Sequence, residues 1–208
     1  MHSEEKCYIQ IEITLTENTI KKGVILKLNY IGIIAAIIAF ISLALPWWTM
    51  TMSAEAMGVK INADVSVYPH IATASAMGQS QTVAMDLWFG SVALALILMA
   101  GVLGIVGSLL VGKNGKIILV AAGILALLSI VIFAVGLQGE LSESAPVSGF
   151  PVVGLFSSGS YGFMGASMDY STYLSFGFWL ALIAAIIAFI SLGKHPMPTP
   201  AAPTPPES

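Results

Sequence analysis

Residues 117–137 read IILVAAGILALLSIVIFAVGL and contain no charged side chain. A helix needs roughly 20 apolar residues to cross about 30 Å of hydrocarbon. The run is continuous and does not alternate with period two, so a helix is favoured over a strand. This stretch therefore predicts a transmembrane helix, and it suggests that lipid is the solvent for much of the chain.

Three further stretches, 28–48, 87–111 and 173–193, have the same character. Of the 208 residues 57% are hydrophobic and 9% are charged, whereas soluble domains are about a quarter charged. The predicted fold class is an all-α membrane protein with a four-transmembrane-helix antiparallel bundle. This transmembrane domain covers residues 28–193.

The ends of the chain lie outside this domain. Residues 1–27 are predicted as a cytoplasmic N-terminal segment, and a start near Val24 would leave 1–23 out of the mature chain. Cleavage after Ser42-Leu43-Ala44, which would make the first span a signal peptide, is the other alternative. Residues 194–208 are dense in proline and predict an extended cytoplasmic tail.

Lysine placement predicts the orientation of the spans. Of the eight basic residues, all lysines, only Lys60 lies in an outer loop. Because cytoplasmic segments carry the excess of lysine, we expect a multi-pass plasma-membrane protein with both termini and the turn at 112–116 in the cytoplasm. The long loops 49–86 and 138–172 then lie outside. Tryptophans near the outer boundary are expected as interfacial anchors, namely Trp47, Trp48 and Trp88.

The outer loops predict a small extracellular β-sheet. Residues 59–67 alternate between apolar and polar side chains, which indicates a half-buried strand. Residues 49–52 alternate too and are expected to pair with them across a turn near 56–58. A third, edge strand is predicted at 150–156, because Pro151 cannot donate a hydrogen bond to a neighbour, and a turn is predicted at 157–162.

Small residues within the spans are spaced for close helix contact. In lipid, such residues let two helix backbones approach. They predict packing within the bundle, and self-association through residues 87–111 is the alternative. The predicted packing residues are Gly101, Gly104, Ser108, Gly177 and Ala181.

One segment, IAAIIAFISL, occurs at 34–43 and again at 183–192. The two copies would cross the membrane in opposite directions, as the halves of some transporters do. The other two spans show no matching relation, so we interpret the repeat as chance similarity in a small apolar alphabet.

Seven of the 10 methionines lie in the outer loops and offer soft thioether ligands. Thioethers suit Cu(I), and a histidine can add a nitrogen. The alternative is that methionine serves as a flexible apolar filler. If copper binds, the expected ligands are Met50, Met52, Met164, Met168 and His70, and no other cofactor is expected.

Several function classes lack the residues that they need. No Asp, Glu, Lys, Arg or His lies within a span, which argues against proton-coupled carriers and pumps. No basic patch for nucleic acid is present. The three histidines lie in different segments without a nucleophile–His–acid set, so we expect no enzyme. Cys7 is the single cysteine and cannot form an intramolecular disulfide.

The layout resembles the claudin and peripheral-myelin-protein group of four-span membrane proteins. Pro46-Trp47-Trp48 at the end of the first span is similar to the position of the tryptophan that opens the first outer loop of claudins. The Gly-Leu-Trp motif and the cysteine pair of that loop are absent here. The resemblance implies a similar fold and an adhesion or barrier function.

The leading hypothesis is a non-enzymatic membrane protein that acts through protein–protein contacts. It would be an accessory subunit of a membrane complex or a claudin-like surface protein, with residues 49–68 and 150–156 as the partner surface. Expected partners are the lipid bilayer and other membrane proteins or further copies of the chain. The alternatives are an extracytoplasmic copper-binding protein and an oligomeric pore lined by Ser42, Ser91, Ser108, Ser129 and Ser191.

Overall fold

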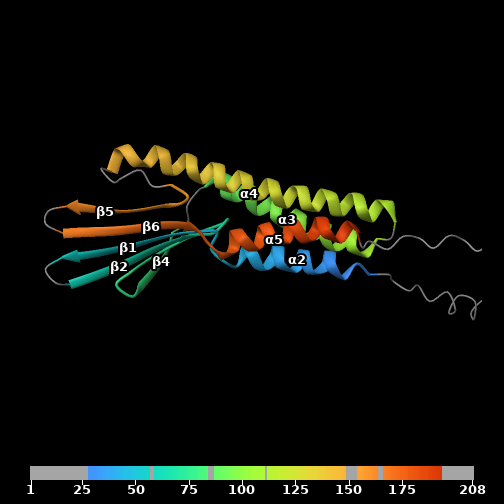
Figure 1. Ribbon diagram of the computed structural model, residues 1–208, viewed down its shortest axis with the longest axis horizontal. Coiled ribbons are helices and arrows are strands. Elements are labelled where there is room, and N and C mark those ends of the chain that lie inside the picture. Colours follow the sequence, from blue (N-terminus) through green and yellow to red (C-terminus); the bar gives the residue numbers. More distant parts are fainter. Residues whose placement is uncertain are drawn as a thin grey trace, which may run out of the picture.

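The computed structural model describes residues 28–56, 59–83, 87–110, 112–148, 154–163 and 166–193. Four helices lie side by side in an elongated molecule, a β-sheet occupies one end, and one of the helices continues alongside the sheet (Figure 1). The helices are α2 (Tyr30–Leu43), α3 (Trp88–Leu109), α4 (Lys113–Ser148) and α5 (Phe176–Gly193). The strands are β1 (Trp48–Ala56), β2 (Val59–Val67), β3 (Ala72–Ala76), β4 (Gln79–Val83), β5 (Ser157–Phe163) and β6 (Ala166–Leu174).

The predicted fold class, an all-α bundle of four membrane spans, is wrong. The described residues include a six-stranded antiparallel sheet in the order β4-β3-β2-β1-β6-β5. Three helices are long and apolar enough to cross a membrane, namely α3, residues 113–143 of α4, and α5. Their length and composition indicate a membrane protein.

Helix α2 is apolar but shorter than the three membrane-length helices. Its 14 residues extend about 21 Å at 1.5 Å per residue, which is less than the roughly 30 Å of hydrocarbon. The span predicted at 28–48 is cut short because the chain leaves the helical conformation ahead of Pro46. Trp48 already belongs to β1.

The sheet is larger than the sequence indicates. The strand predicted at 59–67 is confirmed as β2, and its predicted partner 49–52 lies within β1, with Thr51 opposite Asp64. The strand predicted at 150–156 is wrong for 154–156, which are not in a strand, while 150–153 lie outside the described residues. The turn predicted at 157–162 is also wrong, because these residues form β5. Strands β3 and β4 were not predicted.

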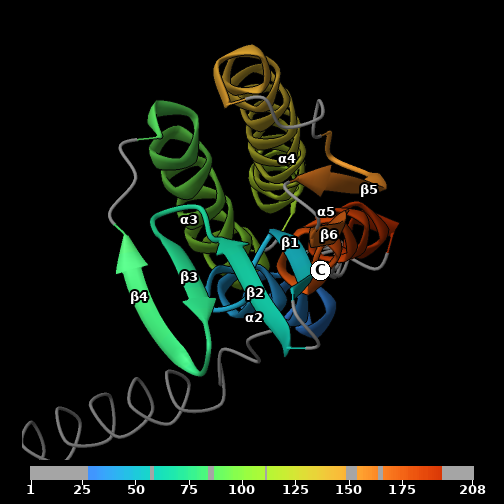
Figure 2. The ribbon, with the colours of Figure 1, turned by 90° about the vertical axis from the view of Figure 1, so that its left-hand side faces the viewer.

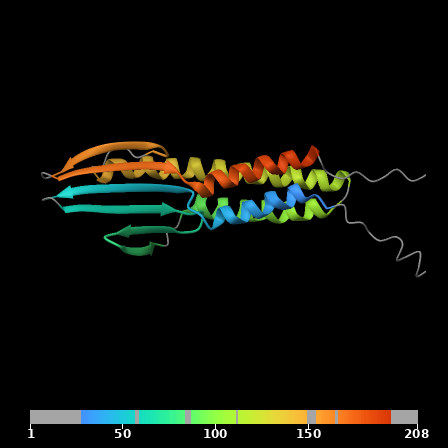
Figure 3. The same cartoon turned by 60° about the horizontal axis from the view of Figure 1, so that its bottom comes forward.

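Main-chain hydrogen bonds join the sheet to the helices. The Trp47 amide donates to the Val67 carbonyl at 2.8 Å, and the Ser175 amide donates to the Trp47 carbonyl at 2.9 Å. The Gly177 amide donates to the Pro46 carbonyl at 2.9 Å. A Cβ at Gly177 would lie 2.5 Å from the Leu45 carbonyl oxygen, so only glycine allows this approach. The α2–β1 and β6–α5 connections are therefore hydrogen-bonded to each other and form one junction between the sheet and the helices. Figure 3 shows the chain passing there from α2 to β1 and from β6 to α5.

Alanines and glycines fill the axis of the helix bundle. The void there is about 10 Å³ and is lined by Ala35, Ala36, Ala39, Ala100, Gly104, Ala122, Ala126, Ala184 and Ala188. This is about the volume of one water probe. The helices therefore pack closely around this part of the axis.

The repeated segment buries the same face in both copies. In 34–43 and in 183–192, the three alanines and the serine are buried while the first, fourth and eighth residues are exposed. Phe40 packs over Gly101 of α3, and Phe189 packs over Gly123 of α4. The two copies therefore perform the same packing role on α2 and α5.

Candidate functional site

The sheet has two faces of different chemistry, which the strand register defines. Side chains opposite one another across the strands share a face. The apolar face carries Trp48, Met50, Met52, Ala54, Ile61, Ala63, Val65, Val67, Ala72, Ala74, Met168, Tyr170 and Leu174, together with the polar residues Thr172, Gln79 and Gln81. The polar face carries Thr49, Thr51, Ser53, Glu55, Lys60, Asn62, Asp64, Ser66, Thr73, Ser75, Ser167, Asp169, Ser171 and Tyr173.

The apolar face is turned toward the helices. Met50 and Val65 pack against the same core cluster as Leu141 of α4 and Leu155. The Leu155 amide donates to the Gln138 side-chain oxygen of α4 at 3.2 Å. Figure 2 shows α4 passing next to β5, at the end of the curved sheet away from β4.

The polar face presents hydroxyl, amide and carboxylate groups. Lys60 and Asn62 of β2 and Asp169 of β6 are exposed. Lys60 lies opposite Glu55 in the register, while Asp64 and Asp169 add negative charge to the same face. Such a face supplies many hydrogen-bond donors and acceptors, which suits contact with another protein.

The structure brings together some of the predicted metal ligands. Met50, Met52 and Met168 share the apolar face, and Met168 is the diagonal neighbour of Met52, because Met52 pairs with Tyr170. Diagonal neighbours are about 7–8 Å apart, within reach of long side chains. Two thioethers are thus placed to approach one ion.

The other two predicted ligands do not join them in what the structure describes. Met164 lies outside the described residues. His70 lies just beyond Val67, which pairs with Trp48, whereas Met168 pairs with Ala54. Six residues of β1 separate those positions, about 20 Å of strand. Within the described ranges, no three His, Cys, Asp or Glu side chains group as a metal site.

The predicted packing residues lie inside the molecule. A Cβ on Gly101 would meet the Phe40 ring at 2.6 Å, and one on Gly104 would meet Ala36 Cβ at 3.2 Å. Ser108 and Ala181 are fully buried. Gly177 lies at the junction between sheet and helices. These small residues therefore make contacts within one chain.

Four of the serines proposed to line a pore are fully buried as well. Each donates its hydroxyl hydrogen bond to a main-chain carbonyl of the same chain, at 2.6–2.7 Å. They are Ser42, Ser108, Ser129 and Ser191, and Ser91 is exposed. The four buried serines do not lie on a surface that a second copy can share.

The interfacial-anchor prediction is wrong for Trp47 and Trp48. Trp47 is fully buried, its ring centroid is 5.0 Å from that of Phe133, and its indole N–H donates to the Ser42 carbonyl at 2.9 Å. Trp48 is 3% exposed. Both side chains fill the core where sheet and helices meet. Trp88 is 64% exposed, as an anchor would be.

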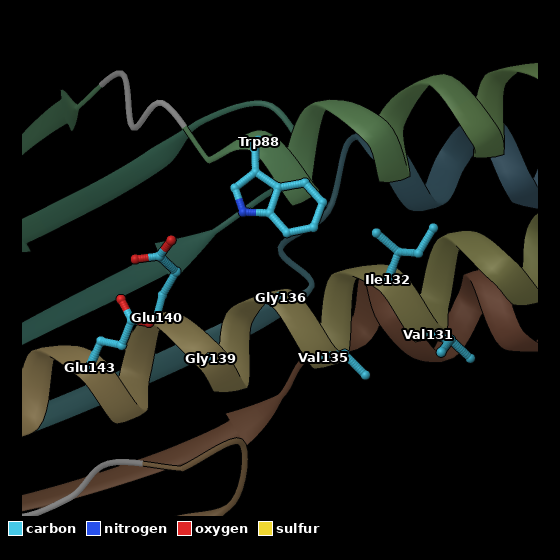
Figure 4. A pocket seen from close by; sticks show the side chains of 8 residues that line it. All are labelled: Trp88, Val131, Ile132, Val135, Gly136, Gly139, Glu140 and Glu143. Carbon is cyan, nitrogen blue, oxygen red and sulfur yellow. The ribbon is translucent and has the colours of Figure 1, made fainter.

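A groove of about 540 Å³ lies between the start of α3 and the second half of α4. It is called the α3/α4 groove here, and it is lined by Trp88, Val131, Ile132, Val135, Gly136, Gly139, Glu140 and Glu143 (Figure 4). A Cβ at Gly136 would collide with the Phe89 ring, whereas one at Gly139 meets nothing within 4 Å. The two helices thus touch at Gly136, and the space above Gly139 is open.

The acidic end of this groove was missed because the third apolar stretch was expected to end at residue 137. Helix α4 continues to Ser148, so Glu140 and Glu143 lie on helix and not in a loop. Leucine, glutamine and glutamate, which favour helices, follow residue 136 with no proline before Pro146. That composition was the available signal.

No protein-family model and no curated protein matches the chain. The resemblance to claudins therefore stays a prediction. Function is inferred from the residues and their geometry.

Proposed function

We propose that this is a non-enzymatic protein of the plasma membrane that acts through protein–protein contacts, with the β-sheet as its docking surface outside the cell. One observation carries the proposal: a sheet with an exposed polar face is joined to membrane-length helices by the Trp47 junction. A sheet joined in this way is kept at a fixed distance from the bilayer and in a fixed orientation.

The placement of the lysines supports the orientation. Lys113 and Lys116 lie at the start of α4, at the end of the bundle away from the sheet (Figure 1). Lysines favour the cytoplasmic side. Asn29 at the start of α2 contacts Ser191 near the end of α5, so the chain enters and leaves the bundle at this same end. Both termini are then cytoplasmic.

The chemistry of the polar face indicates the kind of partner. It is rich in hydroxyls and carries more carboxylates than lysines, so a protein with a polar, mildly basic surface suits it. An accessory subunit of a membrane complex and a surface adhesion protein are the two forms of this function.

Photocrosslinking in native membranes tests the proposal. A photoreactive amino acid at position 62, on the exposed polar face, is expected to crosslink a defined protein. The same amino acid at position 98 is the control, because Leu98 of α3 is 40% exposed on the helix bundle. If positions 62 and 169 both give no crosslinked protein in cells that express the chain natively, the proposal is overturned.

Copper binding is the second candidate, and the shared face of Met52 and Met168 favours it. Copper binding requires that both thioethers coordinate one ion and that the apolar side of the sheet encloses this ion. Soft thioether sites select Cu(I) over harder divalent metals.

A further inference from the structure

We propose that the α3/α4 groove binds an amphiphile that carries an ammonium group on an aliphatic chain. This site is separate from the polar face of the sheet and does not depend on the proposed docking function. It rests on the order of side chains along the groove, on its open floor and on the charge around it.

The groove is apolar at one end and acidic at the other. Along α4, Figure 4 shows Val131 and Val135 at one end, the two glutamates at the other, and Trp88 between them. Val131 is 55% exposed and Val135 is 67% exposed. Both belong to the stretch of α4 that is apolar enough for a membrane, so a hydrocarbon chain can enter from the lipid.

The acidic end suits a cation. Glu140 and Glu143 are three residues apart, a spacing that puts both carboxylates on the same side of α4. The Trp88 indole is 64% exposed, and tryptophan is the side chain that binds cations best through its ring face. A carboxylate pair beside an indole therefore offers both an ion pair and a cation–π contact to one ammonium group.

The surrounding charge has the sign needed to attract this ligand. Besides Glu140 and Glu143, residues 49–86 and 138–172 contain four acidic residues and one lysine, Lys60. Excess charge of one sign raises the local concentration of the opposite ion. An anionic amphiphile would be repelled, and a neutral one would gain nothing from the acidic end.

The floor of the groove provides a selective way to block it. A Cβ at Gly139 meets no atom within 4 Å, so Gly139→Leu can enter the groove without pushing α3 and α4 apart. The matched charge variants are Glu143→Gln, alone and together with Glu140→Gln. Asp64→Asn, on the polar face of the sheet, removes one carboxylate elsewhere and serves as the control.

Photolabelling of the purified full chain in a neutral maltoside detergent tests the proposal. The probe is a dodecyl chain with a trimethylammonium head and a diazirine in the chain, and the matched probe has a neutral sugar head. The ammonium probe is expected to label residues 131–143, with competition from dodecyltrimethylammonium. Gly139→Leu and the double glutamine variant should lower labelling at least about tenfold, while Asp64→Asn should not.

Three outcomes would overturn the proposal. Equal labelling by the neutral probe would make the groove an ordinary site for lipid tails. Competition by tetramethylammonium at the same concentration as the dodecyl compound would make the ligand a small cation. Unchanged labelling in Gly139→Leu, with the variant still folded by circular dichroism, would place the probe elsewhere.

Discussion

The side-chain amide of Asn29 donates a hydrogen bond of 3.1 Å to the Ser191 carbonyl, which joins the start of α2 to the end of α5. The same side chain accepts from the Gly32 amide at 3.3 Å and so caps α2. The Asn29 main-chain amide donates to the Ser108 carbonyl at 3.1 Å. Asn29 is 3% exposed. One buried residue thus satisfies polar groups at the ends of three helices, where main-chain groups lack helical partners.

Asn29→Ala is expected to destabilise the protein by about 2–3 kcal/mol, because it removes the cap and one further buried hydrogen bond. Asn29→Ser should lose less, since serine still caps α2 and cannot bridge to Ser191. Unfolding titrations with sodium dodecyl sulfate in mixed micelles measure both. Equal losses for the two variants would contradict a separate contribution from the bridge.

The two adjacent tryptophans should respond differently to the same substitution. Trp47→Phe removes the bond to the Ser42 carbonyl and is expected to cost about 1–3 kcal/mol. The Trp48 indole nitrogen is buried without a hydrogen-bond partner among the described residues, so Trp48→Phe removes an unsatisfied donor and should cost about 1 kcal/mol less than Trp47→Phe. Measured free energies of unfolding of the two variants test this difference. A larger loss for Trp48→Phe would show that its indole N–H is bonded.

Gly104→Leu is expected to push α3 away from α2, because even a Cβ at this position would lie 3.2 Å from Ala36 Cβ. Overpacking of this kind costs about 1–3 kcal/mol, and Gly104→Ala should cost less. Gly193→Leu is the control, since a Cβ there meets no atom within 4 Å. Thermal unfolding in detergent measures the effect. A variant that keeps its melting temperature and loses crosslinked dimers would instead favour self-association through α3.

The local sequence pattern was sufficient to predict the β1–β2 hairpin. Alternation in residues 59–67 gives β2, and the same period in 49–52 gives part of β1. Strands β3 (ATASA) and β5 (SSGSYGF) are rich in alanine, serine and glycine, and alanine and glycine are depleted in strands. They form because an adjacent strand offers main-chain partners, and that information is not local.

The candidate sites were less predictable for a similar reason. The α3/α4 groove depends on where α3 begins relative to Gly136 and Gly139, which only the packed structure shows. Trp47 and Trp48 look like anchors in the sequence because they follow an apolar run. Their burial comes from the return of β6 to the junction, where Ser175 binds the Trp47 main chain.

The methionine pair gives a direct prediction for copper. If Met52 and Met168 bind Cu(I), Met52→Leu and Met168→Leu should each weaken binding by at least about tenfold, because a two-thioether site loses half of its ligands. Leucine keeps the apolar volume, so folding should be unaffected. Titration with Cu(I) under reducing conditions measures the affinity. Binding weaker than about micromolar in the unaltered protein would remove copper from consideration.

Labelling of single cysteines tests the orientation of the sheet. In a Cys7→Ser background, Asn62→Cys and Ser160→Cys replace exposed residues of the sheet, and Asn114→Cys replaces an exposed residue at the start of α4. A membrane-impermeant maleimide should modify positions 62 and 160 on intact cells, and position 114 only after permeabilisation. The reason is that Lys113 and Lys116 favour the cytoplasmic side. The opposite pattern would place the sheet inside the cell, and the outer docking surface would then be excluded.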